Sequence, residues 1–359
     1  MALTINDVLT YGLRGTARKI RTGVPRTKFL QEHFFGGEGG IVTAERTLKL
    51  KVKKLSRKAS DFAQWDTKGN ILSDKDGYAY VLIDAPYLYD RRIITPSDLA
   101  HLDFEEDPRN PMPYDEKLML CLRNCREDLY DEQDTRVELM AMEMLQSGSI
   151  TTPDLGTQTY PISATMFVDA DSDADGNLDN ATNPVDWIEK KLKKIYDDSG
   201  ILANEIVLSP ELIWTLLGSS VVNDVLLDTR RINGGQMDFE EYRDDGVAFF
   251  GYLNIPEFGA VALLTYAGRY TDANGIEQSI FPANSMLIGR RNLGNINYAG
   301  VYSNAEGYKM SVPVAQKEFV HVVEGDGDIP ANLAICRQTS PVLAPMVMGG
   351  WMFVENVNQ

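Results

Sequence analysis

The sequence contains little of the chemistry that most enzymes use. Histidine occurs only at His33, His101 and His321, and none of the three lies in a motif with the spacing of metal or catalytic ligands. The sequence has no phosphate loop of the GxxxxGK[ST] kind and no GxSxG nucleophile motif. Carboxylates are so abundant that no particular pair is informative. The sequence therefore does not predict an enzyme, and no motif requires a cofactor.

Cysteines and long apolar runs are also scarce. Three cysteines, Cys121, Cys125 and Cys336, are too few for a disulfide framework and indicate a reducing compartment. Cys121 and Cys125 stand one helical turn apart, and we interpret them as buried packing residues. No apolar run approaches the roughly 20 residues that span a bilayer. The first 15 residues lack the basic-then-apolar order of a signal peptide. We expect no membrane partner.

Charge is unevenly distributed along the 359 residues. The net charge is −17, from 35 basic and 52 acidic residues. Residues 1–60 hold 13 basic and 4 acidic residues, which gives this segment a net charge of +9. The rest of the chain holds 35−13=22 basic and 52−4=48 acidic residues, which gives it a net charge of −26. The chain is a basic arm on an acidic body. Such an arm could bind nucleic acid or the acidic surface of another copy. The acidic body would repel the phosphates of a nucleic acid over most of its surface.

The basic region contains a pattern typical of a two-stranded excursion. Residues 42–58 alternate apolar and lysine side chains, residues 66–77 supply turn residues, and residues 78–88 predict a returning strand. An isolated hairpin is marginal in water. We therefore expect this hairpin and the basic arm before it to lie on a neighbouring molecule and not on their own body.

The rest of the sequence predicts an α+β protein. Apolar residues recur at helical spacing over residues 115–148 and again over residues 183–200, so each range predicts a helix. Gly148 is the predicted C-terminal end of the first helix. Further elements are predicted as a buried strand and short helix in residues 205–220, and as strands in residues 246–254, 260–272 and 286–291. The tetrapeptide at 272–275, DANG, predicts a hairpin turn.

The stretch DADSDADGNLDN, residues 169–180, resembles a calcium loop. In the one register that fits, oxygen ligands would come from Asp171, Asp173, Asp175, Asn177 and Asp179, with Gly176 at the sixth position. The twelfth position is Thr182, where a bidentate Glu is expected, unless Asp186 or Glu189 reaches back. The alternative interpretation is a solvated acidic turn. Calcium is thus a possible ligand of an accessory loop.

One segment carries a family resemblance. Residues 226–289 are similar to the major capsid proteins of lambda-type tailed bacteriophages, the capsid protein E family. The matching residues are the DTRR element at Asp228, Thr229, Arg230 and Arg231, then Val261, Tyr266, Gly268 and Tyr270, then Phe281, Pro282, Asn284, Met286, Leu287 and Gly289. Weaker similarities in the family's order occur at 91–99, 136–151 and 340–346.

The resemblance implies the Hong Kong phage 97-type major capsid protein fold. It would divide the chain into an N-terminal arm (1–40), an extended loop (41–90), a peripheral domain (91–185) with a spine helix (115–148), an axial domain (186–310) and a C-terminal return to the peripheral domain (311–359).

The implied function is a capsid protein that self-assembles into hexamers and pentamers of an icosahedral shell around the phage genome. Assembly would take place in the bacterial host cytoplasm and end in the virion. Since a long N-terminal helical extension is lacking, we expect a separate scaffolding protein, besides a portal, a decoration protein and packaged DNA held without sequence-specific contacts. Two other functions stay open: a calcium-dependent surface-binding module, and a nucleic-acid-binding protein that uses the basic arm.

Overall fold

The computed structural model describes most of the chain. The described residues are 28–37, 39–52, 79–100, 113–173, 175–178, 183–219, 221–222, 246–304, 311–324 and 333–358.

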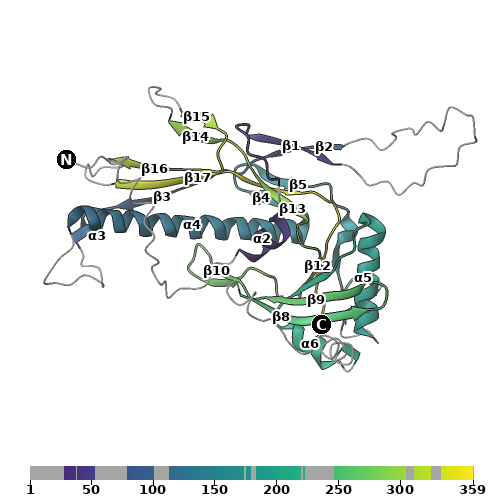
Figure 1. Ribbon diagram of the computed structural model, residues 1–359. Helices are drawn as coiled ribbons and strands as arrows, with labels where there is room; N and C mark the ends of the chain where they lie inside the picture. Colours follow the sequence, from purple (N-terminus) through teal and green to yellow (C-terminus); the bar gives the residue numbers. More distant parts are fainter. Residues whose placement is uncertain are drawn as a thin grey trace, which may run out of the picture.

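A six-stranded mixed sheet has the order β6-β19-β12-β7-β9-β8. Its strands β12, β9 and β8 lie below the helix α4 (Tyr114–Ser147) in Figure 1. Its strands are β6 (Phe167–Asp169), β7 (Glu205–Leu208), β8 (Val247–Ile255), β9 (Gly259–Tyr266), β12 (Met286–Gly289) and β19 (Met352–Glu355). The central strand β7 is buried over its whole length, which requires cover on both faces.

The two faces of this sheet are covered by different helices. Ile206 and Leu208 pack with α5 (Pro184–Ser199) and α6 (Leu212–Gly218) in one apolar cluster. Val207, between them, faces a second and larger cluster that contains side chains of α2 (Phe29–Phe35) and α4 (Tyr114–Ser147). The alternation follows from the two-residue period of a strand.

The spine helix α4 extends from the six-stranded sheet to a second, three-stranded sheet. That sheet has the order β16-β17-β3, from β3 (Leu88–Ile94), β16 (Glu318–Glu324) and β17 (Leu333–Thr339). Its Ile94 and Ile335 pack on Leu122 and Leu129 of α4 in a small cluster. Short α3 (Pro96–Ala100) adds Leu99 to it.

The remaining strands form two-stranded ribbons around α4. They are β1 (Thr47–Val52) with β2 (Ala79–Asp84), β4 (Ser149–Thr152) with β5 (Gly156–Thr159), β10 (Arg269–Thr271) with β11 (Glu277–Ser279), β13 (Gly294–Tyr298) with β18 (Pro341–Pro345), and β14 (Val301–Asn304) with β15 (Ser311–Val314). A 3-10 turn, η2 (Ala164–Met166), precedes β6.

Several predicted elements are confirmed. The helix predicted over 115–148 is α4, and its C-cap Gly148 has φ +67° and donates its N–H to Met144 O at 2.8 Å. A side chain there would also meet the ring of Phe167. The DANG turn joins β10 to β11, with Gly275 at φ +80°. The predicted strand 78–88 is instead two strands, because the chain turns at residues 85–87 to pair with β17.

The predicted domain boundaries stay predictions. The six-stranded sheet draws β6 from the predicted peripheral segment, β7, β8, β9 and β12 from the predicted axial segment, and β19 from the C-terminal segment. In the described part of the chain, no helix is long and apolar enough to cross a membrane.

Candidate assembly interface

The β1–β2 ribbon has one buried and one exposed face. The pairing register sets Leu48 opposite Ile83 and Lys49 opposite Leu82. Opposite residues share a face, so Leu48 and Ile83 point inward, and both are buried. Lys49 and Leu82 point outward, and Leu82 is 68% exposed. The Lys49 ammonium lies 4.2 Å from the ring centroid of Tyr80, another exposed side chain. The outer face therefore presents both apolar and cationic groups.

The root of the ribbon packs on its own body. Leu48, Ile83 and Ala85 belong to the same apolar cluster as α2 and the C-terminal half of α4. The expectation that the arm and hairpin depend on a neighbouring molecule is therefore wrong for residues 28–37 and for the root of the ribbon. The physical reason is local burial: Leu30 and Phe34 of α2 are fully enclosed.

Two buried carboxylates hold α2 to the body from opposite ends. Glu138 of α4 accepts hydrogen bonds from the backbone N–H groups of the first turn of α2. At the last turn, His33 Nε2 contacts Glu205 at the start of β7, and Arg291 Nε donates to Glu205 Oε1 at 2.7 Å. Burial alone would raise the pKa of Glu205, but His33 and Arg291 outweigh it and hold this pKa below its usual range. Sequence reasoning missed both anchors.

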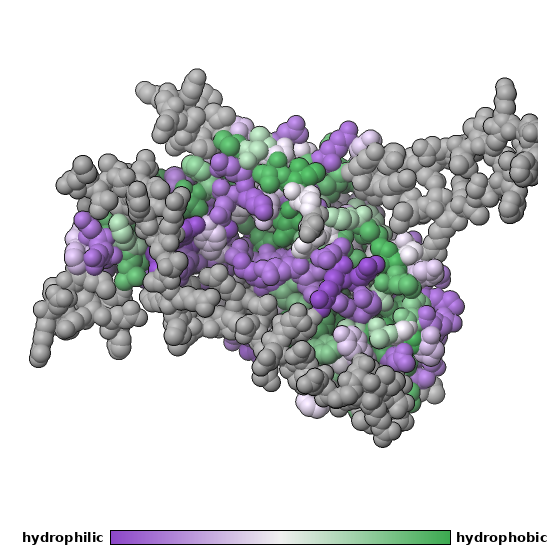
Figure 2. Space-filling model, in the orientation of Figure 1, coloured by the Kyte–Doolittle hydropathy of each residue, from purple (hydrophilic) through white to green (hydrophobic). Residues whose placement is uncertain are grey.

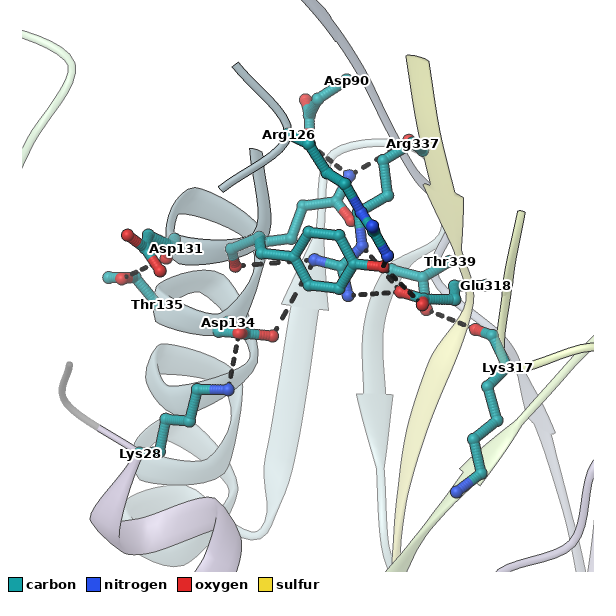
Figure 3. A network of polar contacts seen from close by, with 12 residues as sticks. Lys28, Asp90, Arg126, Asp131, Asp134, Thr135, Lys317, Glu318, Arg337 and Thr339 are labelled. Carbon is teal, nitrogen blue, oxygen red and sulfur yellow. Dashed lines mark hydrogen bonds and ion pairs between the residues drawn. The ribbon is translucent and has the colours of Figure 1, made fainter. Parts of the chain in front are cut away.

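A polar network joins α4 to β16 and β17 (Figure 3). The guanidinium of Arg337 lies 3.7 Å from the ring centroid of Tyr130 and forms an ion pair of 3.0 Å with Glu318. Asp134 of α4 pairs with Lys28, just before α2, at 2.6 Å, and lies 3.9 Å from Arg337. The network therefore links the N-terminal segment, the spine helix and the three-stranded sheet.

Two aspartates of the acidic loop pair with lysines of α5. The buried Lys191 ammonium contacts Asp173 and lies 3.1 Å from Asp175 Oδ2, while Lys190 donates to Asp175 Oδ1 at 3.1 Å. Asp171 accepts a 2.7 Å hydrogen bond from the Asn177 side chain.

The calcium hypothesis stays a prediction. Gly176 has φ +66°, as the sixth position of a calcium loop requires, and Trp187 Nε1 donates to its carbonyl at 2.9 Å. Asp179 and Thr182 lie outside the described residues. Among the residues that are described, no three His, Cys, Asp or Glu side chains are grouped to hold a metal ion. An incoming calcium would compete with Lys191 for the oxygens of Asp173 and Asp175.

The residues that carry the family resemblance have structural roles. Tyr266 is buried and donates to Glu138, and a side chain on Gly268 would collide with the Tyr266 ring. Phe281 packs edge-on against Tyr266. Asn284 adopts φ +57° and donates its side-chain amide to the carbonyl of Asn358 at 2.7 Å. The DTRR element at 228–231 lies outside the described residues.

The thiols of Cys121 and Cys125 are part of the α4 packing surface. Both are half-buried and contact the small cluster beneath the three-stranded sheet. The hydrogen bond between the Cys125 and Cys121 thiols, followed by burial, raises the pKa of Cys125 far above its usual range. A protonated, packed thiol is unreactive, in line with the packing role predicted for this pair.

The surface near the ribbon root is hollowed. A cavity of about 870 Å³ is lined by residues of the ribbon root, α4, the β4–β5 ribbon and β14, among them Ala85, Tyr87, Met140, Leu155 and Tyr302. In Figure 2, hydrophilic side chains form a band over the middle of the molecule, where α4 lies in Figure 1, and hydrophobic side chains are visible above it. The ribbon thus leaves the body beside a partly apolar hollow.

A long spine helix, a six-stranded sheet and an extended ribbon define the class of shell proteins with the Hong Kong phage 97-type fold. The model of a family described as phage major capsid protein E matches residues 15–306, and the chain belongs to this family. It is a structural capsid protein of the virion, and many copies of it form the shell. No curated protein matches the chain significantly.

Solved structures show the same fold at low sequence identity. One is a crystal structure described as that of a prophage capsid protein of E. coli CFT073, with a TM-score of 0.62, 17% identity and 99% of both chains covered. Another is the capsid asymmetric unit of Cyanophage A-1(L), with a TM-score of 0.54, 10% identity and 96% of both chains covered. These likenesses confirm the predicted fold.

Proposed function

We propose that the chain assembles as hexamers and pentamers of an icosahedral shell that encloses the phage genome, and that the β1–β2 ribbon of each copy lies on its neighbour. The observation that carries this proposal is the outer face of the ribbon. Leu82 and Tyr80 are 68% and 55% exposed, on a hairpin whose inner face is already satisfied by its own body. Single exposed apolar residues are ordinary, but Leu82 and Tyr80 are neighbours on one face of the same ribbon, and contiguous apolar groups mark interaction surfaces.

The charges of the chain fit the same arrangement. The lysine side chain at position 49 shares the outer face with Leu82, and the chain beyond residue 60 carries a net charge of −26, from 22 basic and 48 acidic residues. Opposite charges between copies would select partner and register. Such heterologous contacts close into rings when the rotation between copies closes.

The finer assignments belong to the same proposal. Assembly takes place in the host cytoplasm with a separate scaffolding protein, and the finished shell holds a portal, a decoration protein and DNA without sequence-specific contacts. The chain has no enzymatic activity in this scheme. What supports these assignments is the family to which the chain belongs.

The test is the substitution Leu82→Asp, with Leu202→Asp as matched control because Leu202 is also exposed, at 52%, but lies outside the ribbon. Each chain is expressed with its candidate scaffold and examined by electron microscopy. We expect closed shells from the wild type and L202D, and at least about tenfold fewer from L82D, since a charge replaces an apolar contact.

The unfolding free energy of each subunit shows whether a substitution impairs assembly or folding. Both substitutions are on the surface, so each should change the unfolding free energy by no more than about 0.5 kcal/mol. Normal shells from L82D would contradict the proposed role of the ribbon. A wild-type chain that stays monomeric with its scaffold would contradict the assembly proposal itself.

A further inference from the structure

Glu138 is a carboxylate buried at the junction of three elements. Its side chain is wholly enclosed in the middle of α4. Its Oε1 accepts from Leu30 N at 2.7 Å and from the Tyr266 hydroxyl at 2.8 Å, and its Oε2 accepts from Gln31 N at 3.0 Å. One side chain therefore ties α2, at the end of the N-terminal arm, to the spine helix and to β9.

The protonation of this carboxyl is finely balanced. Burial raises the pKa of Glu138 to about 7, even though the hydrogen bonds from Gln31, Leu30 and Tyr266 act in the opposite direction. The nearby carboxylate of Glu32 raises it further. When neutral, the carboxyl can donate to the Tyr266 oxygen, since a phenol also accepts hydrogen bonds.

Two other charged groups at the ends of α2 have partners in the body, whereas Glu32 of the first turn is exposed. Lys28, just before the helix, pairs with Asp134 of α4 at 2.6 Å. His33, in the last turn, contacts Glu205 of β7. Glu205 is ionised across neutral pH because its pKa is held below the usual range. Of the two carboxylates that hold α2, Glu138 has its pKa raised toward neutrality and Glu205 has its pKa lowered.

We propose that Glu138 is a proton-sensitive latch on α2: its neutral form holds the helix against the spine helix more tightly than its ionised form. When α2 leaves its position, Glu138 becomes hydrated and returns toward the ordinary affinity of a carboxyl for protons. The docked state therefore binds the proton more tightly than the undocked state. By linkage, docking is strongest at low pH and weakens as pH rises through neutrality.

The latch acts where the N-terminal segment joins the body. The chain passes from α2 along β13 to the ribbon root, through hydrogen bonds such as Thr43 N to Tyr298 O at 2.9 Å. A change in α2 docking would therefore alter the start of the ribbon. Only this consequence for contacts between copies rests on the proposed function; the latch itself is a property of the single subunit.

Hydrogen exchange of the full-length subunit tests the latch. The probe is the protection of the Leu30 and Gln31 amides between pH 5.5 and 8.5, corrected for the intrinsic exchange rates. We expect wild-type protection to fall by roughly 10- to 100-fold over this range, because the docked and undocked pKa values differ by about two units. Constant protection across the range would overturn the proposal.

Three variants locate the effect. Glu138→Gln removes the titrating group and should abolish the pH dependence. Tyr266→Phe removes a hydrogen bond that lowers the pKa of Glu138, so the fall should move to higher pH. His33→Gln removes the second anchor of α2, so protection should be lower at every pH but should still fall as pH rises. The control Glu132→Gln, at an exposed carboxylate of the same helix, should keep the wild-type profile.

Each outcome decides between the alternatives. A Glu138→Gln profile that matches the wild type would overturn the proposal, and so would loss of the pH dependence in His33→Gln, which would assign the effect to the His33–Glu205 pair. If Glu138→Gln does not fold, Tyr266→Phe decides, because an unshifted profile in that variant would exclude Glu138 as the titrating group.

Discussion

The two halves of the spine helix are held by different forces. From Met140 to Leu145, α4 lies in the large apolar cluster between the six-stranded sheet, α2 and the ribbon root. From Leu118 to Leu129, it meets the smaller cluster beneath the three-stranded sheet, beside the network of Arg337. The same helix is therefore a core element at one end and a polar-anchored element at the other. The difference indicates that the far end contributes less apolar burial to the stability of the subunit.

The largest effect should come from a matched pair of leucines on this helix. Leu145 is fully buried in the large cluster and Leu122 is 5% exposed in the small one. We expect Leu145→Ala to lower the unfolding free energy by about 3–5 kcal/mol and Leu122→Ala by about 2–3 kcal/mol, since the cost depends on how completely neighbours enclose the lost atoms. Urea unfolding followed by helical circular dichroism measures both. Equal losses would remove the distinction between the two halves.

A smaller effect should follow from breaking the polar anchor. Arg337→Met removes the ion pair with Glu318 and the contact with the Tyr130 ring, and we expect a loss of about 2 kcal/mol in unfolding free energy. Arg92→Met is the control, because Arg92 is 42% exposed and pairs with Glu132 on the surface, where an ion pair contributes no more than about 1 kcal/mol. An Arg92 variant that loses as much as the Arg337 variant would show that burial of the network is unimportant.

The local elements were predictable from the sequence because their signals are local. The α4 helix begins and ends within one residue of the prediction, and α5 ends at Ser199 with Gly200 as its C-cap, at φ +78°. The DANG turn is local in the same way: Gly275 adopts φ +80°, and the Asp272 carboxylate accepts hydrogen bonds from the N–H groups of Asn274 and Ile276.

The anchors of α2 were not predictable because they join distant parts of the chain. Glu138 and Leu30 are 108 residues apart, and Glu205 and His33 are 172 residues apart. In the sequence, Glu138 is one of many acidic residues, and no pattern marks it as buried. The sheet order, in which β19 lies between β6 and β12, is non-local in the same way.

The acidic loop gives the sharpest comparison between a pattern and a structure. Its spacing left a calcium loop and a solvated acidic turn open, and the described structure brings the ammonium of Lys191 to Asp173 and Asp175. We expect calcium to bind the wild type weakly, because it must displace a lysine that is 1% exposed. Lys191→Gln should bind calcium more tightly, since two carboxylates lose their counter-ion. Lys190→Gln is the control, because Lys190 is 63% exposed and contacts only Asp175 among the described ion pairs.

Calorimetric titration of the full chain measures calcium binding.

Acid unfolding measures the pairing between the lysines and the loop. The lysines at 190 and 191 hold the pKa of Asp175 below its usual range, with Lys190 the largest influence. The loop therefore adds stability above the ordinary pKa of an aspartate and loses it as pH falls through the lowered value. In Lys191→Gln this acid-dependent loss should shrink, with a stability cost of about 1–2 kcal/mol at neutral pH. Tight calcium binding by the wild type would show that calcium displaces Lys191, and would favour the calcium loop over the solvated acidic turn.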